Sequence, residues 1–146
     1  MNSVTLRPVE ILLVEDCLSD AKLIGKIFSR ATIPHNLQLV EDGIEALDFL
    51  YQRGKYYSAI RPDLILLDLN LPKKDGLEVL AKIKADHQLS KIPVIILSNS
   101  DCPQDILSCY QMDANCYLTK PSNLPEFKET INMIENFWLS FVRLPL

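Results

Sequence analysis

The sequence lacks the features that mark several large classes of protein. No stretch approaches the roughly 18 consecutive apolar residues that a membrane-spanning helix needs, and the first apolar stretch, within MNSVTLRPVEILLVED, is too short for a signal peptide. There is no basic run, and 15 basic against 19 acidic residues leave a net charge of -4, which disfavours nucleic acid and anionic membranes as partners. We therefore expect a cytoplasmic protein that binds neither DNA nor membranes.

Paired cysteine motifs are missing as well. Cys17, Cys102, Cys109 and Cys116 form no CxxC pair and have no histidine at zinc-site spacing. Neither a redox motif nor a structural zinc site is therefore indicated. We expect all four side chains to be reduced thiols that serve packing.

Short apolar runs are present, and they predict a parallel sheet. Three runs are continuous rather than alternating: Val9–Val14, Leu64–Leu67 and Val94–Leu97. Continuous runs suit strands that are buried on both faces, as in a parallel sheet. Residues 37–40 and 116–118 are weaker candidates for a second and a fifth strand.

Helical patterns alternate with these strands. Residues 42–45 (DGIE) and 75–78 (DGLE) each place an acid three residues before a Glu, as a capping box does. Ser19-Asp20 is the predicted N-terminal cap of a first helix, Pro103 is typical of a helical first turn, and residues 127–138 carry one apolar stripe. Strand and helix thus alternate five times, which predicts an α/β fold with helices on both faces of the sheet.

Polar or charged residues stand at the ends of four predicted strands. Glu15 and Asp16 follow the first strand, Asp68 the third, Ser98 the fourth and Lys120 the fifth. In a parallel sheet the carboxyl ends of the strands share one edge, where ligands bind near a topological switch point. We therefore expect these five residues to converge on one crevice.

The chemistry of this group favours a metal ion and a phosphoryl group. Three carboxylates at close range raise one another's pKa unless a cation joins them. Oxygen ligands without His or Cys favour a hard ion, and a site of few carboxylates with room for water suits Mg²⁺. The Lys120 ammonium and the Ser98 hydroxyl complete a site in which a carboxylate attacks phosphorus while cations neutralise the phosphoryl oxygens.

Four motifs in this order resemble the receiver domains of two-component response regulators. VEILLVED, LILLDLNLPKKDG, VIILSNS and YLTKP place the resemblance over residues 8–137. It implies a flavodoxin-like doubly wound (βα)5 sandwich whose parallel sheet has the order 2-1-3-4-5. It also implies that Asp68 is the phosphoacceptor, that Asp16, Asp68 and the main-chain carbonyl of Asn70 bind Mg²⁺, and that Glu15 holds the water shell of the metal.

The same resemblance implies roles for the remaining site residues. Ser98 and Lys120 would bind the phosphoryl oxygens, Tyr117 would be the switch aromatic that moves inward, and the bond between Lys120 and Pro121 would be cis. The chain departs from the commoner family pattern in having Glu-Asp as its acidic pair and Ser in place of Thr. Neither departure removes a function, although the metal affinity could shift.

A narrower resemblance concerns the partner. The segments GKYYSAIRPD, LDLNLPKKDG and FWLSFVRLPL are similar to those of the small regulators that serve cyanobacterial phytochromes. This implies a sensor histidine kinase, a bacterial phytochrome, as the phosphodonor. The domain would act as a stand-alone regulator and phosphorelay component, and not as an enzyme that turns over a metabolite.

Each site residue also has an ordinary interpretation when it is taken alone. Asp68 could mark where a strand meets solvent, Asp16 could cap the first helix, and Lys120 could be a solvated surface charge. Ser98 fits common turn chemistry. Tyr117 is a residue that strands favour in any case.

Two other functions compete with the receiver interpretation. One is an aspartyl-phosphate phosphatase of the HAD-like type, but Asn70 stands where such an enzyme needs a second acid, and a carboxamide cannot act as a general acid. The other is a flavin-binding or purely structural and interaction module on the same fold.

The length and the ending of the chain set its domain organisation. The 146 residues, 48% of them hydrophobic, fit one receiver domain over 1–146 with a short apolar extension from about 137. Trp138, Phe141 and Leu144 make this ending unusually apolar. A large exposed apolar patch usually marks an interface, so we expect a homodimer through the last helix and the tail.

Overall fold

The fold is a five-stranded parallel sheet in the order β2-β1-β3-β4-β5. The computed structural model describes residues 7–146. Its strands are β1 (Val9–Val14), β2 (His35–Val40), β3 (Leu64–Leu67), β4 (Val94–Ser98) and β5 (Cys116–Thr119). The strand order confirms the predicted flavodoxin-like topology.

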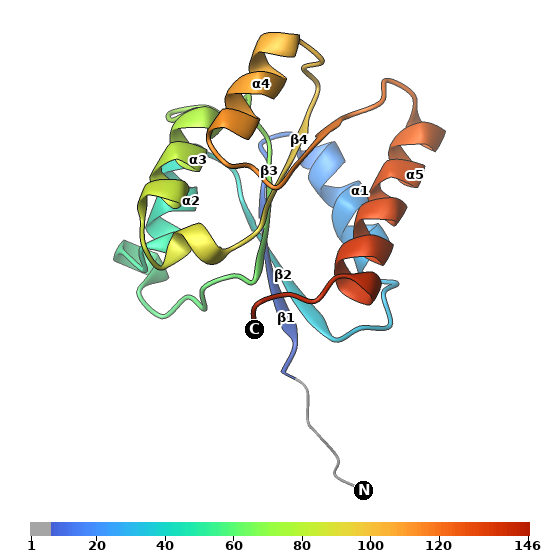
Figure 1. Ribbon diagram of the computed structural model, residues 1–146. Coiled ribbons are helices and arrows are strands. Elements are labelled where there is room, and N and C mark those ends of the chain that lie inside the picture. Colours follow the sequence, from blue (N-terminus) through green and yellow to red (C-terminus); the bar gives the residue numbers. More distant parts are fainter. Residues whose placement is uncertain (1–6) are drawn as a thin grey trace, which may run out of the picture.

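Helices cover both faces of the sheet (Figure 1). One face carries α1 (Leu18–Phe28) and α5 (Leu124–Glu135), and the other carries α2 (Gly43–Leu50), α3 (Gly76–Ala85) and α4 (Pro103–Gln111). Short 3₁₀ helices lie at Gly54–Tyr56 (η1) and Leu89–Lys91 (η2), and α5 continues into a π-helix at Asn136–Phe141 (η3). None of these helices is long and apolar enough, within residues 7–146, to cross a membrane.

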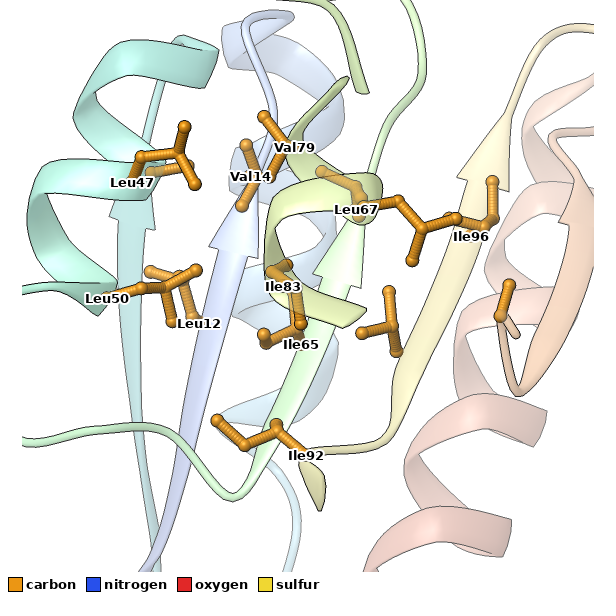
Figure 2. Close-up of a cluster of buried hydrophobic side chains, with 14 of the residues drawn as sticks. Leu12, Val14, Leu47, Leu50, Ile65, Leu67, Val79, Ile83, Ile92 and Ile96 are labelled. Atoms are coloured by element: carbon orange, nitrogen blue, oxygen red, sulfur yellow. The ribbon is translucent and has the colours of Figure 1, made fainter. Parts of the chain in front are cut away.

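The two faces of the sheet form separate hydrophobic clusters because alternate residues of a strand point to opposite sides. Figure 2 shows the cluster on the side of α2 and α3, where Leu12, Ile65 and Ile96 of the strands face Leu47 and Ile83 of the helices. The second cluster joins the other strand residues to α1 and α5. All four residues of β3 are buried, which explains why its sequence is a continuous apolar run.

Three helices begin with the side-chain caps that a capping box provides. The carboxylates of Asp42 and Asp75 accept hydrogen bonds from main-chain N–H groups three residues later, at 2.7 and 2.9 Å, as predicted. Asn123 caps α5 in the same way. The predicted cap of the first helix is wrong, because α1 begins directly after Cys17 without a side-chain cap and Asp20 is turned toward the site described below.

Two further predictions need correction. Cys109 is buried and Cys116 is half-buried, but Cys17 and Cys102 are exposed because they stand at the N-termini of α1 and α4, outside the packed core. The bond between Lys120 and Pro121 is trans, as are all peptide bonds within the described residues. Trans is the more stable form of such a bond by about 0.5–1 kcal/mol when nothing in the surroundings selects cis.

Candidate functional site

The predicted site residues lie along the carboxyl edge of the sheet. The strand registers bring the carboxyl ends of β1 and β3 level, since Val14 pairs with Leu67, and those of β4 and β5 level, since Ser98 pairs with Thr119. The residues that follow these ends, among them Glu15, Asp16 and Asp68, therefore face the same side of the molecule. Such an edge is where ligands bind in open α/β sheets.

Three carboxylates form an acidic cluster at this edge. Glu15, Asp16 and Asp68 each offer one carboxylate oxygen, and these oxygens lie within 4.8 Å of one another. Glu15 and Asp68 are buried, whereas Asp16 is exposed and leaves the cluster open to solvent. The donors are all oxygens and few in number, which fits a hydrated hard cation such as Mg²⁺ or Mn²⁺.

The raised pKa of Glu15 also fits a site that binds a cation. Burial raises the pKa of its carboxyl to about 7, and the neighbouring Asp68 charge adds to the rise, while the Lys120 ammonium opposes it. One oxygen of Glu15 also accepts the N–H of Cys17, at 3.2 Å. A divalent cation in the cluster would favour the charged form of this carboxyl.

Lys120 is the cationic counterpart of the cluster. Its side chain is 2% exposed, and its ammonium donates to Glu15 at 2.5 Å, to Asp20 at 2.9 Å and to Asp68 at 3.1 Å. An ammonium has three N–H donors, so all of them are used. Burial lowers the pKa of Lys120, but its carboxylate partners outweigh burial and the net shift is upward. A fully paired buried charge is the arrangement that proteins tolerate.

Asp68 is held by a second polar contact. Its other carboxylate oxygen accepts the main-chain N–H of Asn70 at 3.2 Å. Asn70 itself is exposed in the loop after β3. The contact brings Asn70 to the site, and its expected role as a carbonyl ligand of the metal stays a prediction.

Ser98 and Tyr117 meet at a residue that sequence reasoning missed. The buried Ser98 hydroxyl accepts the N–H of Ser100 at 3.2 Å, and the Tyr117 hydroxyl donates to the carbonyl of Ser100 at 2.7 Å. Tyr117 is 9% exposed, and its burial raises the pKa of its hydroxyl. The main-chain N–H of Tyr117 donates to the hydroxyl of Tyr110 in α4. The loop between β4 and α4 therefore connects Ser98 with Tyr117.

The start of α3 packs unusually closely against the site. A Cβ atom added to Gly76 would lie 2.3 Å from the carbonyl oxygen of Asp68 and 2.5 Å from the Cα of Leu69. The N–H of Gly76 also donates to the carbonyl of Leu69 at 2.8 Å. Only glycine fits here, because the atoms that it meets belong to the main chain and cannot rotate away.

Asp20 is a second residue that sequence reasoning missed. The sequence pattern predicts a helix cap at this position, but the Asp20 carboxylate binds Lys120, which lies 100 positions later in the chain. The available signal is its position, four residues after Asp16 and in the first turn of the helix that follows β1. That signal becomes useful only once α1 is known to begin at Leu18.

Comparison with known proteins agrees with this arrangement. A family model described as "Response regulator receiver domain" matches residues 11–132. Response regulator Rcp1 of Synechocystis sp. is 48% identical over 138 residues, which cover 94% of this chain and 94% of that protein. The probable methanogenesis regulatory protein FilR2 of Methanothrix harundinacea is 38% identical over 138 residues, covering 94% of this chain and 88% of that protein.

Solved structures show the same likeness in three dimensions. The Mn(2+)-bound form of Rcp1 matches with a TM-score of 0.94 at 47% identity, over 95% of this chain and 100% of that one. The phosphorylated cyanobacterial phytochrome response regulator RcpA matches with a TM-score of 0.93 at 49% identity, over 96% of this chain and 100% of that one. With its acidic cluster and its buried lysine at the carboxyl edge of a 2-1-3-4-5 sheet, this chain belongs to the family of response regulator receiver domains.

Proposed function

We propose that Asp68 accepts a phosphoryl group from a phosphohistidine of a partner sensor kinase, and that the phosphorylated domain signals through a change of conformation. The observation that carries this proposal is the position of the Asp68 carboxylate. It is 5% exposed, lies 3.1 Å from the Lys120 ammonium and belongs to the acidic cluster. A carboxylate placed in this way has both a nucleophilic oxygen and a neighbouring cation for the incoming phosphoryl group.

The transfer balances as a single displacement. A carboxylate oxygen of Asp68 forms a bond to phosphorus, while the N–P bond of the phosphohistidine breaks. The electron pair of that bond stays on the imidazole nitrogen, which takes a proton from solvent. Lys120 gives up its bond to the Asp68 oxygen and donates to a phosphoryl oxygen instead. Mg²⁺ held by Asp16 and Asp68 would supply further positive charge for the phosphoryl oxygens.

The loop between β4 and α4 would carry the signal away from the site. When the Ser98 hydroxyl turns to a phosphoryl oxygen, it no longer accepts the N–H of Ser100 in its present geometry. Ser100 also holds the hydroxyl of Tyr117, so a shift of this loop changes the position of the switch aromatic. Such a two-state element is what a phosphorylation switch requires.

The partner that we propose is a bacterial phytochrome with histidine kinase activity, acting in the cytoplasm. The support is the 48% identity with Rcp1 and the likeness to RcpA, a cyanobacterial phytochrome response regulator. The phosphatase and the purely structural alternatives find no support in these comparisons. Asn70 stands where the phosphatase would need its second acid.

Intact-protein mass spectrometry tests the phosphoacceptor. We expect one phosphoryl adduct after incubation with Mg²⁺ and acetyl phosphate, and none in Asp68→Asn or in protein treated with a chelator. An adduct that persists in folded Asp68→Asn would contradict the assignment. Turnover of a generic phosphate ester by the purified protein would instead favour the phosphatase.

We also propose that the chain forms a homodimer through the end of α5 and η3. The side chains of Met133, Phe137 and Phe141 are 61%, 53% and 72% exposed. An apolar pocket beside them is lined by residues of β5, α5 and η3, including Leu118 and Trp138. Together these residues form an exposed apolar surface at the edge of the molecule, of the kind that marks an interface.

Point substitutions test the dimer better than truncation does. Removing the chain after Asn136 would delete Leu139, which is buried in the core beside α1 and α5, and would thus disturb the fold itself. We expect Phe137→Glu to sediment as a monomer and the wild type as a dimer. Ile60→Glu, at an exposed apolar side chain in the loop before β3, is the matched control and should remain dimeric. A dimeric Phe137→Glu would exclude this surface.

A further inference from the structure

Asp20 reaches the site from a different element than the other carboxylates that hold Lys120. Glu15 follows β1 and Asp68 follows β3, whereas Asp20 lies in the first turn of α1. Its carboxylate accepts from the Lys120 ammonium at 2.9 Å, and its side chain is 24% exposed. A cavity of about 360 Å³ lies beside this ion pair, bordered also by Asn99 and Pro121.

Asp20 differs from the other two partners of Lys120 because it lies outside the acidic cluster. Glu15 and Asp68 belong to the group of carboxylates whose oxygens converge within 4.8 Å, and Asp20 does not. A cation in that cluster would draw Glu15 and Asp68 toward itself, because it carries the larger charge. Asp20 would then be the carboxylate that continues to hold the ammonium.

Phosphorylation would increase the importance of this contact. The Asp68 oxygen that now binds Lys120 would lose its negative charge in an acyl phosphate, so Lys120 must turn one N–H to the phosphoryl group. The three N–H donors of an ammonium have a fixed tetrahedral arrangement. A partner that holds one donor in place limits the directions in which the others point.

We propose that Asp20 is a positioning residue for phosphoryl transfer. By binding Lys120 from α1, it holds the ammonium so that the N–H released from Asp68 meets the phosphoryl group. This inference rests on the proposed function, since it assumes that Asp68 is the phosphoacceptor. Asp20 does not touch the reacting atoms and acts through Lys120.

A purely structural role is the competing explanation. An acid in the first turn of a helix interacts favourably with the helix dipole, and Asp20 would stabilise α1 in this way without any effect on Lys120. Glu126 offers a matched comparison, because it is an exposed acid in the first turn of α5, the helix beside α1. Replacing either acid by Ala removes a dipole interaction, but only Asp20→Ala removes a partner of Lys120.

The experiment compares four proteins: wild type, Asp20→Ala, Asp20→Asn and Glu126→Ala. The first readout is the rate of adduct formation at saturating Mg²⁺ and acetyl phosphate, with Mg²⁺ affinity measured separately by calorimetry. We expect Asp20→Ala to be slower by about five- to tenfold, the effect of losing a charged hydrogen bond that is partly exposed to solvent. Asp20→Asn keeps an acceptor oxygen, so its rate should lie between those of the wild type and Asp20→Ala. The Mg²⁺ affinity of the Asp20 variants should match that of the wild type. The rate of adduct formation in Glu126→Ala should match it as well.

The second readout does not depend on phosphorylation. In metal-free protein the buried Lys120 ammonium should give a slowly exchanging ¹⁵N–H signal in nuclear magnetic resonance spectra, because all its donors are bonded. This signal should broaden in Asp20→Ala and persist in Glu126→Ala. If Asp20→Ala folds poorly, the nearly isosteric Asp20→Asn carries both readouts.

The outcomes separate this inference from the proposed function. A wild-type rate or a faster one in Asp20→Ala would overturn the positioning role, as would an unchanged ammonium signal. A slower rate accompanied by an equal loss of Mg²⁺ affinity would also overturn it, because Asp20 would then act through the metal. If the wild type itself gains no adduct, or if Asp68→Asn gains one, the proposed function fails, and the ammonium signal alone decides whether Asp20 holds Lys120.

Discussion

Replacing Gly76 by Ala perturbs Asp68, the proposed phosphoacceptor, through the main chain alone. The new Cβ would lie 2.3 Å from the Asp68 carbonyl oxygen, whereas ordinary van der Waals contact begins at 3.4 Å, so the two must separate by 1.1 Å. The obstructing atoms are backbone atoms, and the loop that carries Asp68 has to move as a unit. The substitution therefore displaces the Asp68 carboxylate without changing any of the residues that bind it.

The expected size of the effect follows from this displacement. Overpacking of this kind costs about 1–3 kcal/mol of unfolding free energy, and the less flexible unfolded chain of the variant offsets about 0.4–1 kcal/mol. We therefore expect a net loss of about 1 kcal/mol. A misplacement near 1 Å lowers the rate of a positioned reaction by about 100-fold.

Two assays measure these effects separately. Urea unfolding followed by circular dichroism gives the free energy of unfolding, and intact mass after incubation with acetyl phosphate gives the rate of adduct formation on folded protein. Gly25→Ala is the control, because its Cβ would meet nothing within 4 Å in the interior of α1. It should stabilise the protein by about 0.5–1 kcal/mol and leave the rate unchanged. Wild-type stability and rate in Gly76→Ala would refute the reasoning.

Three further predictions concern a cap, a thiol and the switch. Asp75→Ala removes the N-terminal cap of α3 and should cost about 1 kcal/mol of unfolding free energy in urea titrations; an unchanged midpoint would show that the cap contributes nothing. Burial raises the pKa of Cys109 to about 11, so at pH 8 only about 0.1% of it is thiolate, and iodoacetamide should label exposed Cys17 but spare Cys109 until the protein unfolds. Equal labelling of both thiols would contradict this. Tyr117→Phe deletes the bond to Ser100 and should speed amide exchange in the loop between β4 and α4, with phosphorylation by acetyl phosphate retained; unchanged exchange would mean that this bond does not hold the loop.

The parts of the fold that could be predicted are those in which local sequence carries the cause. β3 reads as a continuous apolar run because both its faces are buried, and α2 and α3 begin at Asp-Gly-x-Glu because the cap is a local contact. The apolar pattern predicts that β2 begins at Leu37, but the strand begins at His35, which pairs with Val9. It is an edge strand with exposed positions, so pairing and not apolar character sets its start.

The predicted site was right about which residues lie at the edge and incomplete about how they are connected. Glu15, Asp16 and Asp68 follow strands whose ends could be read from the sequence, and the fold brings them together. The contact between Asp20 and Lys120 could not be read in that way. It depends on where α1 begins and on the packing of segments that lie far apart in the chain, and neither leaves a local pattern.

The central claim is that the phosphoryl group resides on Asp68. Treatment of the phosphorylated protein with borohydride reduces an acyl phosphate to an alcohol, which converts the modified aspartate into homoserine. Peptide mapping by tandem mass spectrometry then reads the modified position directly. We predict homoserine at position 68 only, and only in protein that was incubated with both Mg²⁺ and acetyl phosphate. Homoserine at position 16, or a phosphoryl group that resists borohydride, would contradict the account.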